Sequence, residues 1–281
     1  MSDFQTIINT ASGAVLAGTL AGPLKSLENI WYSSIGYRFD LFAQKKKIQM
    51  EQDLEKYKEE IANEVIKIPK NNIVEPKLSV VGPALEASKY YIDEEVLRKM
   101  FARLIANSMN KTSATNIHPA FVEFIKQMTS IDAHVLNEIH LNGNNIAIVK
   151  YREQAVKDGY KDYLAEVPAT KDRQDKYKEH SAAIINLTRL GLIRYTYKEQ
   201  LLSFDYYQTF LNSQSYKDAY RQARARRMNV NKTISAFEKA ARNNGIPYTA
   251  SFDDEENIHL SIIKGVAVVT PLGINFIKTC L

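Results

Sequence analysis

Residues 259–281, HLSIIKGVAVVTPLGINFIKTCL, contain the patterns that decide the fold of the C-terminal half. The Ile and Val residues before Thr270 predict a pair of strands, because β-branched side chains pack well on a pleated sheet. Thr270 and Pro271 predict the start of a helix, since Thr caps helices and proline fits their first position. The stretch therefore predicts strands that lead directly into a terminal helix.

A helix and a strand are also predicted upstream, after Thr129. Thr129 and Asp132 have the spacing of a capping box, and Gly143 is placed to end the helix that they begin. The apolar residues at 146–149 then indicate a short strand.

The segment HSAAIINLTRLGLIRY (180–195) predicts a second helix followed by another strand. Gly191 ends this helix at a position that requires a left-handed residue, and 192–195 continue as the strand. Helix, helix, strand, strand, helix is the order of a winged helix-turn-helix. We therefore expect a mainly α chain in which 129–281 form a winged-helix-like α+β domain.

One feature departs from that order. About 60 residues separate the strand at 192–195 from the strand near Ile258, where a plain wing needs only a few. Most of these residues have a helical pattern. We expect an inserted helical hairpin at about 203–245.

Long helices are predicted in the N-terminal part of the chain. From 25 to 68 no proline interrupts a helical pattern, so 1–68 form an N-terminal helical region. Three prolines between 69 and 83 then predict an extended connector. This connector and a helical core together make up 69–128.

Residues 4–24, FQTIINTASGAVLAGTLAGPL, contain no charged side chain. The length suits a bilayer core, but many polar residues dilute its hydrophobicity. Ala14, Gly18 and Gly22 form a small-xxx-small ridge, which lets helices approach closely in membranes or in soluble bundles. We favour a helix 4–24 that is buried against the protein or a second copy, with reversible membrane contact and a membrane span as the alternatives.

The composition gives little support to an enzyme. The 281 residues include one cysteine, Cys280, and five scattered histidines, which excludes an internal disulfide and a Cys-based zinc site. The sequence has no phosphate-binding loop and no nucleophile elbow. We expect a cytoplasmic protein with no catalytic residues, no metal and no cofactor.

Positive charge is concentrated in one part of the predicted insertion. Eight cationic and two acidic residues between 217 and 242 give +6, whereas the whole chain carries +5, so the remaining residues sum to −1. Lys217, Arg221, Arg224 and Arg227 share a helical face of roughly 120°, because successive residues turn by 100°. The candidate binding residues are these four and Lys232.

Three interpretations of this basic segment stay open. Tyrosines lie just upstream and could stack on bases, so a nucleic-acid site is one of them; these are Tyr206, Tyr207, Tyr216 and Tyr220. The others are an ordinary solubilising face and a contact with anionic lipid or an acidic partner. The predicted recognition helix at about 177–190 is nearly neutral, which makes it a weaker candidate for DNA.

Residues 68–111, IPKNNIVEPKLSVVGPALEASKYYIDEEVLRKMFARLIANSMNK, form a distinctive string that IHPAFVEFIKQMTSIDAHVL (117–136) extends. This string resembles the Abi-alpha (abortive infection alpha) family of bacterial proteins. LTRLGLI (187–193) and VVTPLGINFIKTCL (268–281) are also similar to that family. The resemblance covers about 65–281.

The resemblance implies a role in anti-phage defence by abortive infection, in which an infected cell stops growing or dies before phage progeny are released. It names no reaction, so we expect a non-enzymatic sensor or effector. Its candidate partners are a second copy, a phage or host protein trigger, nucleic acid and the inner face of the cell membrane. The alternative function is a winged-helix regulator that binds DNA or RNA through the basic insertion.

Overall fold

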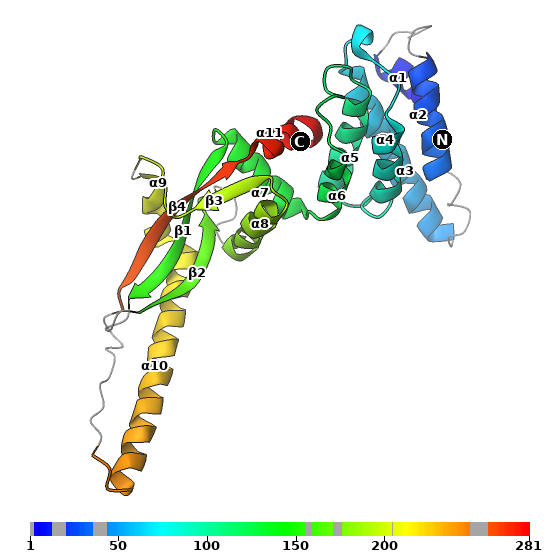
Figure 1. Cartoon of the computed structure of the whole chain (residues 1–281). Helices are drawn as coiled ribbons and strands as arrows, with labels where there is room; N and C mark the ends of the chain where they lie inside the picture. The colour runs from blue at the N-terminus through cyan, green and yellow to red at the C-terminus, as the bar shows by residue number, and fades with distance from the viewer. Residues whose placement is uncertain are drawn as a thin grey trace. The chain divides into compact units, whose positions relative to one another are not determined.

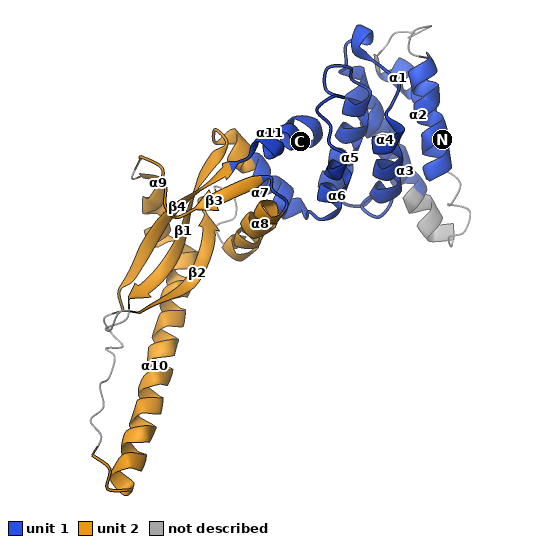
Figure 2. Ribbon diagram, viewed as in Figure 1, with its two compact units in different colours: residues 1–137, 190–192, 269–281 blue, residues 138–189, 193–268 orange. Residues whose placement is uncertain are grey.

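The structure is a computed structural model, in which the contacts between residues group the chain into two units (Figure 2). Unit 1 consists of 1–137, 190–192 and 269–281, and unit 2 consists of 138–189 and 193–268. The structure describes residues 3–12, 21–35, 44–154, 159–170, 176–203, 205–247 and 258–281.

Unit 1 is helical, and helix α5 (Glu95–Ser108) lies at its centre. Helices α3, α4, α6 and α11 all contact α5, which buries an apolar stripe that includes Leu97, Phe101 and Leu104. Its described elements are α1 (Phe4–Ser12), α2 (Ala21–Ser34), α3 (Gln44–Ile66), η2 (Lys70–Asn72), α4 (Leu78–Ser88), α5, α6 (Ala120–Lys126), α7 (Ser130–Leu141), whose residues the two units share, and α11 (Pro271–Cys280).

Helices α1 and α2 are separate helices that pack against each other. The Phe4 amide donates to the Glu28 carboxylate (3.0 Å), although the two residues are 24 positions apart. Lys58, almost fully buried, binds the other oxygen of Glu28 (2.8 Å), and the Phe4 ring meets Trp31 edge to face. A single helix over 4–24 is therefore wrong, since the uncharged stretch supplies residues to both helices. The burial of Phe4 and Ile8 agrees with the expected packing against the protein.

Unit 2 is built around a four-stranded antiparallel sheet with the order β2-β1-β4-β3 (Figure 1). Strands β1 and β4 pair without a break, from Asn145 opposite Val268 to Glu153 opposite Leu260. The elements of this part of the chain are β1 (Asn145–Gln154), β2 (Tyr160–Pro168), α8 (Tyr177–Arg189), β3 (Ile193–Thr196), α9 (Asp205–Gln208), η4 (Thr209–Asn212), α10 (Gln214–Asn243) and β4 (Leu260–Val269).

The described residues confirm a mostly helical chain with a small sheet, but they do not confirm the winged-helix order. Strand β2, which the sequence patterns missed, lies between α7 and α8, so these helices do not follow one another. Its charged residues interrupt the alternation of apolar and polar side chains that predicts a strand. It is stabilised by cross-strand partners instead, because Arg152 on β1 pairs with Asp162 (2.7 Å) and stacks on Tyr160.

The insertion between β3 and β4 also differs from the expected hairpin. In its described residues, two short helical turns, α9 and η4, precede the single 30-residue helix α10. No glycine or proline occurs between 214 and 243, so nothing in the sequence stops the helix there.

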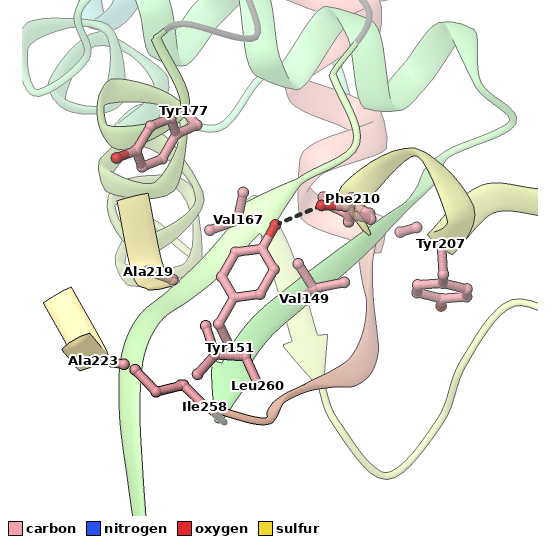
Figure 3. Packing of buried hydrophobic residues seen from close by; sticks show 11 residues of the cluster. Val149, Tyr151, Val167, Tyr177, Tyr207, Phe210, Ala219, Ala223, Ile258 and Leu260 are labelled. Carbon is pink, nitrogen blue, oxygen red and sulfur yellow. Dashed lines mark hydrogen bonds between the residues drawn. The ribbon is translucent and has the colours of Figure 1, made fainter. Parts of the chain in front are cut away.

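The core of unit 2 surrounds Tyr151, which is fully buried (Figure 3). Its hydroxyl group reaches Ser215 (2.7 Å), Ser213 (3.2 Å) and the Phe210 carbonyl (3.4 Å). These contacts tie the first turn of α10 to the middle of β1.

Three of the predicted helix boundaries are confirmed. Thr129 and Asp132 form the expected reciprocal capping bonds, and Gly191 has φ +72°. Thr270 accepts from the Gly273 amide (3.0 Å) and donates to the Gly191 carbonyl (2.6 Å), so the start of α11 is held against residues 190–192. At Gly273 a side chain has no room, because an added Cβ would lie 2.0 Å from the Leu192 carbonyl oxygen.

This close approach yields a stability prediction. Gly273→Ala should lower the stability of unit 1 by about 3 kcal/mol or more, since the clash is with backbone. Gly82→Ala is the matched control, because its Cβ would meet the Leu78 side chain at 3.7 Å, an ordinary van der Waals distance, inside helix α4. Thermal unfolding followed by circular dichroism measures both variants; equal melting temperatures would contradict the packing described.

Candidate functional site

Helix α10 holds most of the candidate residues, and its start is fixed by hydroxyl groups. Ser213 caps the helix by accepting from the Tyr216 amide (3.1 Å). Ser215 is buried and bonded to Tyr151, while Asp218 accepts from the Tyr177 hydroxyl (2.7 Å), which lowers the pKa of Asp218. The first turns of α10 are therefore part of the core of unit 2.

Small residues let α10 lie close to the sheet. Ala219 and Ala223 are fully buried in the cluster around Tyr151 (Figure 3). The pair is four residues apart, so both side chains point to the same side of the helix. This sets the rotation of α10 about its own axis.

A buried carboxylate marks the place where α10 leaves the sheet. Glu153 on β1 is 3% exposed and accepts from the Arg227 guanidinium (2.5 Å) and from the Tyr163 hydroxyl. Arg226 lies 3.8 Å from its other oxygen. Burial and the adjacent Glu153 carboxylate raise the pKa of Tyr163 to about 12. This group of four side chains is called the Glu153 cluster below.

Arg227, one of the predicted binding residues, does not lie among the exposed cations of α10. Its side chain is only 12% exposed, because it turns toward Glu153 instead of solvent. At 100° per residue it lies roughly 60° outside the arc that the other cations occupy. Sequence spacing could not reveal this, since the partner is 74 residues away.

Beyond the Glu153 cluster α10 continues past the end of the strands (Figure 1). None of the side chains from Arg224 to Asn243 is buried. The helix nevertheless ends in an ordered cap, because Gly245 adopts φ +67° and the Ile246 amide donates to the Ala241 carbonyl (2.9 Å). This Schellman arrangement satisfies carbonyls of the last turn without contacts from the sheet.

Six exposed cations follow one line along α10. Their positions are three, four, seven or eight residues apart, which places them within roughly 80° of one another on the helix surface. The line runs for about 38 Å at 1.5 Å per residue. We call it the basic face; it consists of Lys217, Arg221, Arg224, Lys232, Lys239 and Arg242.

Four of the five predicted binding residues lie on this face, together with two further cations. Lys239 and Arg242 contributed to the charge count but were not among the predicted binding residues. Their spacing from Lys232, seven and three residues, was the signal that could have found them.

Few acidic groups oppose the basic face. Arg221 pairs with Asp218 (2.6 Å), and Arg242 pairs with Glu238 (2.7 Å). Among the residues that the structure describes, Arg224, Lys232 and Lys239 have no ion-pair partner.

The opposite side of α10 is apolar on either side of the Glu153 cluster. Val230, Ile234, Phe237 and Ala241 are spaced by four, three and four residues, and they continue the side on which Ala219 and Ala223 meet the sheet. The cations are therefore held on the face that points away from the sheet.

The tyrosines near the basic face do not form a stacking surface. Tyr207 is buried and donates to the Gly265 carbonyl (2.8 Å). Tyr216 and Tyr220 pack against the core cluster, with Tyr216 edge to face on Tyr151. Of the four, Tyr206 is exposed (55%), and it lies on α9.

A small cavity of about 120 Å³ lies beside the start of α10. Its lining includes Thr170, Ser213 and Ser215, whose hydroxyl groups already bond to His180, Phe210 and Tyr151 respectively. The polar groups of this cavity therefore serve the interior of the protein.

The predicted self-association ridge is described in part. Ala14 and Gly18 lie outside the described residues. Gly22 is in α2, where an added Cβ would lie 3.2 Å from a carboxylate oxygen of Glu75. The described ranges contain no helix that is long and apolar enough to cross a membrane, and no group of three or more side chains that could hold a metal ion.

Residues 49–280 match the family described as Abortive infection alpha, which confirms the resemblance. The chain therefore belongs to the abortive infection alpha family. The match includes α10 and the rest of unit 2, but in unit 1 it leaves out α1, α2 and the start of α3. No curated protein and no solved structure matches the chain.

The Glu153 cluster gives a second stability prediction. Glu153→Ala should destabilise unit 2 by about 3 kcal/mol, because it removes the carboxylate that binds the partly buried Arg227 guanidinium. Adding Arg227→Met should recover part of this loss, since the partly buried charge is then removed as well. Thermal unfolding measures both variants.

Glu238→Ala is the control, because it breaks the exposed pair with Arg242 and should cost at most about 1 kcal/mol. If Glu153→Ala is no less stable than Glu238→Ala, then α10 is not anchored in this way.

Proposed function

We propose that the protein acts in abortive-infection defence by binding a negatively charged phage or host partner through the basic face of α10. Membership of the abortive infection alpha family supports the defence role. The observation that carries the binding role is the line of six exposed cations on a helix that extends beyond its sheet.

Charges elsewhere in the described residues are more evenly balanced. Arg98 in unit 1 is nearly buried and bonds Glu60 through two nitrogens (3.0 and 2.9 Å). Lys58 is paired with Glu28. Such pairs stabilise the interior, whereas unpaired cations on an exposed face attract anions from solution.

In this proposal the protein works without catalysing a reaction. Its buried hydroxyl and carboxylate groups near α10 hold the helix in place: Tyr151 fixes the first turn, and Glu153 fixes the point of exit. These contacts would orient the basic face for binding.

Membrane contact through residues 4–24 does not enter the proposal. Phe4 and Ile8, two of the three large apolar side chains of α1, are at most 1% exposed within unit 1. Insertion of α1 into lipid would require these contacts to break. The basic face is available without such a change.

Binding of DNA through α8, the predicted recognition helix, is a weaker candidate than binding through α10. A recognition helix needs cationic or amide side chains on its exposed face. On α8 the exposed residues include Lys178, Glu179 and Ile185, and Arg189 is bonded to Asn186 (2.8 Å). Helix α8 therefore offers little charge to a nucleic acid.

A phage-challenge experiment tests the proposal. Cells that produce the chain should resist at least one phage, and at high multiplicity of infection they should die without releasing progeny. Charge reversal on the basic face, Arg224→Glu with Lys232→Glu and Lys239→Glu, should abolish protection because the partner is no longer attracted.

The matched control reverses three exposed lysines away from α10: Lys25, Lys111 and Lys198. It changes the net charge equally and should leave protection intact. Protection that survives in the α10 variant at equal protein level would contradict the proposed surface, and infected cells that survive at high multiplicity would contradict abortive infection.

A further inference from the structure

We propose that the basic face of α10 binds the phosphate backbone of double-stranded nucleic acid, with no preference for base sequence. This inference rests on the proposed function, because it names the partner of the same surface. Three features of the face support it: its charge, its straightness and its lack of stacking groups.

The charge suits a polyanion with closely spaced phosphates. Duplex DNA carries a negative charge about every 1.7 Å along its axis. The basic face presents six cations over about 38 Å, the length of about 11 base pairs. An acidic protein patch rarely continues in one direction for that distance, whereas a duplex does.

The straightness of α10 matches a stiff partner. Its base is fixed by Ala219, Ala223 and the Glu153 cluster, and its end is capped at Gly245. A duplex is also stiff on this length scale, with a persistence length of about 150 base pairs. Two ordered surfaces lose little conformational freedom when they meet.

The absence of a stacking surface separates a duplex from a single strand. Proteins that bind single strands stack bases on aromatic side chains. Tyr207, Tyr216 and Tyr220 face the core of unit 2, and the described residues between the cations on the face include Met228 and Ser235. The face therefore provides contacts for phosphates and few for unstacked bases.

The experiment is fluorescence anisotropy with the full chain, a labelled 30-base-pair DNA duplex and either of its single strands. Between about 50 and about 200 mM salt, affinity for the duplex should fall with a log–log slope of up to about −5, because six phosphates would be neutralised at about 0.9 each. Two unrelated duplex sequences should bind equally, and the single strand should bind more weakly.

The test variant combines Arg224→Gln, Lys232→Gln and Lys239→Gln, three exposed positions without an ion pair among the described residues. Its duplex affinity at low salt should drop at least about tenfold, and its salt slope should become shallower by about 2.7. The control combines Lys25→Gln, Lys111→Gln and Lys198→Gln, which should change neither quantity.

The inference is overturned if the wild type does not bind the duplex, if the test variant behaves like the control, or if the single strand binds more tightly. Its failure is distinct from failure of the proposed function. If charge reversal abolishes phage protection although the wild type does not bind the duplex, the basic face binds a different partner. Duplex binding through the face without an effect on protection would support the inference and contradict the proposed function.

Discussion

The contact between the buried Glu153 carboxylate and Arg227 is the interaction on which the candidate site depends. A carboxylate that is 3% exposed needs a cation or several donors, and Arg227 and Tyr163 supply them. To reach Glu153, Arg227 must turn toward the sheet. Because a helix is rigid, this rotation places the six cations of the basic face on the side that points away from the sheet.

The position of Glu153 is in turn set by the sheet. Strands β1 and β4 pair in register up to Glu153 and Leu260, and Tyr151, two residues earlier on the same side of β1, bonds the hydroxyl groups that begin α10. Two side chains of one strand therefore hold two points of the helix. Ala219 and Ala223 fill the space between these points, since larger side chains would lift the helix from the sheet.

Local chemistry made part of this structure predictable. The caps at Thr129 and Thr270 and the left-handed Gly191 depend on residues within a few positions, and the structure confirms them. Strand β2 and the inward turn of Arg227 depend on partners across the sheet, so residue spacing alone could not show them. The basic face was largely predictable because helical periodicity is local. The string at 68–136 is enough to indicate the family to which the chain belongs.

Lysine acetylation footprinting in the presence of duplex DNA tests the central claim most directly. Lys217, Lys232 and Lys239 lie on the basic face, while Lys111 and Lys161 are exposed elsewhere. The account predicts that DNA slows acetylation of the first three and leaves the other two unchanged. Equal protection of all five lysines, or protection outside α10 alone, would contradict the claim that α10 is the binding surface.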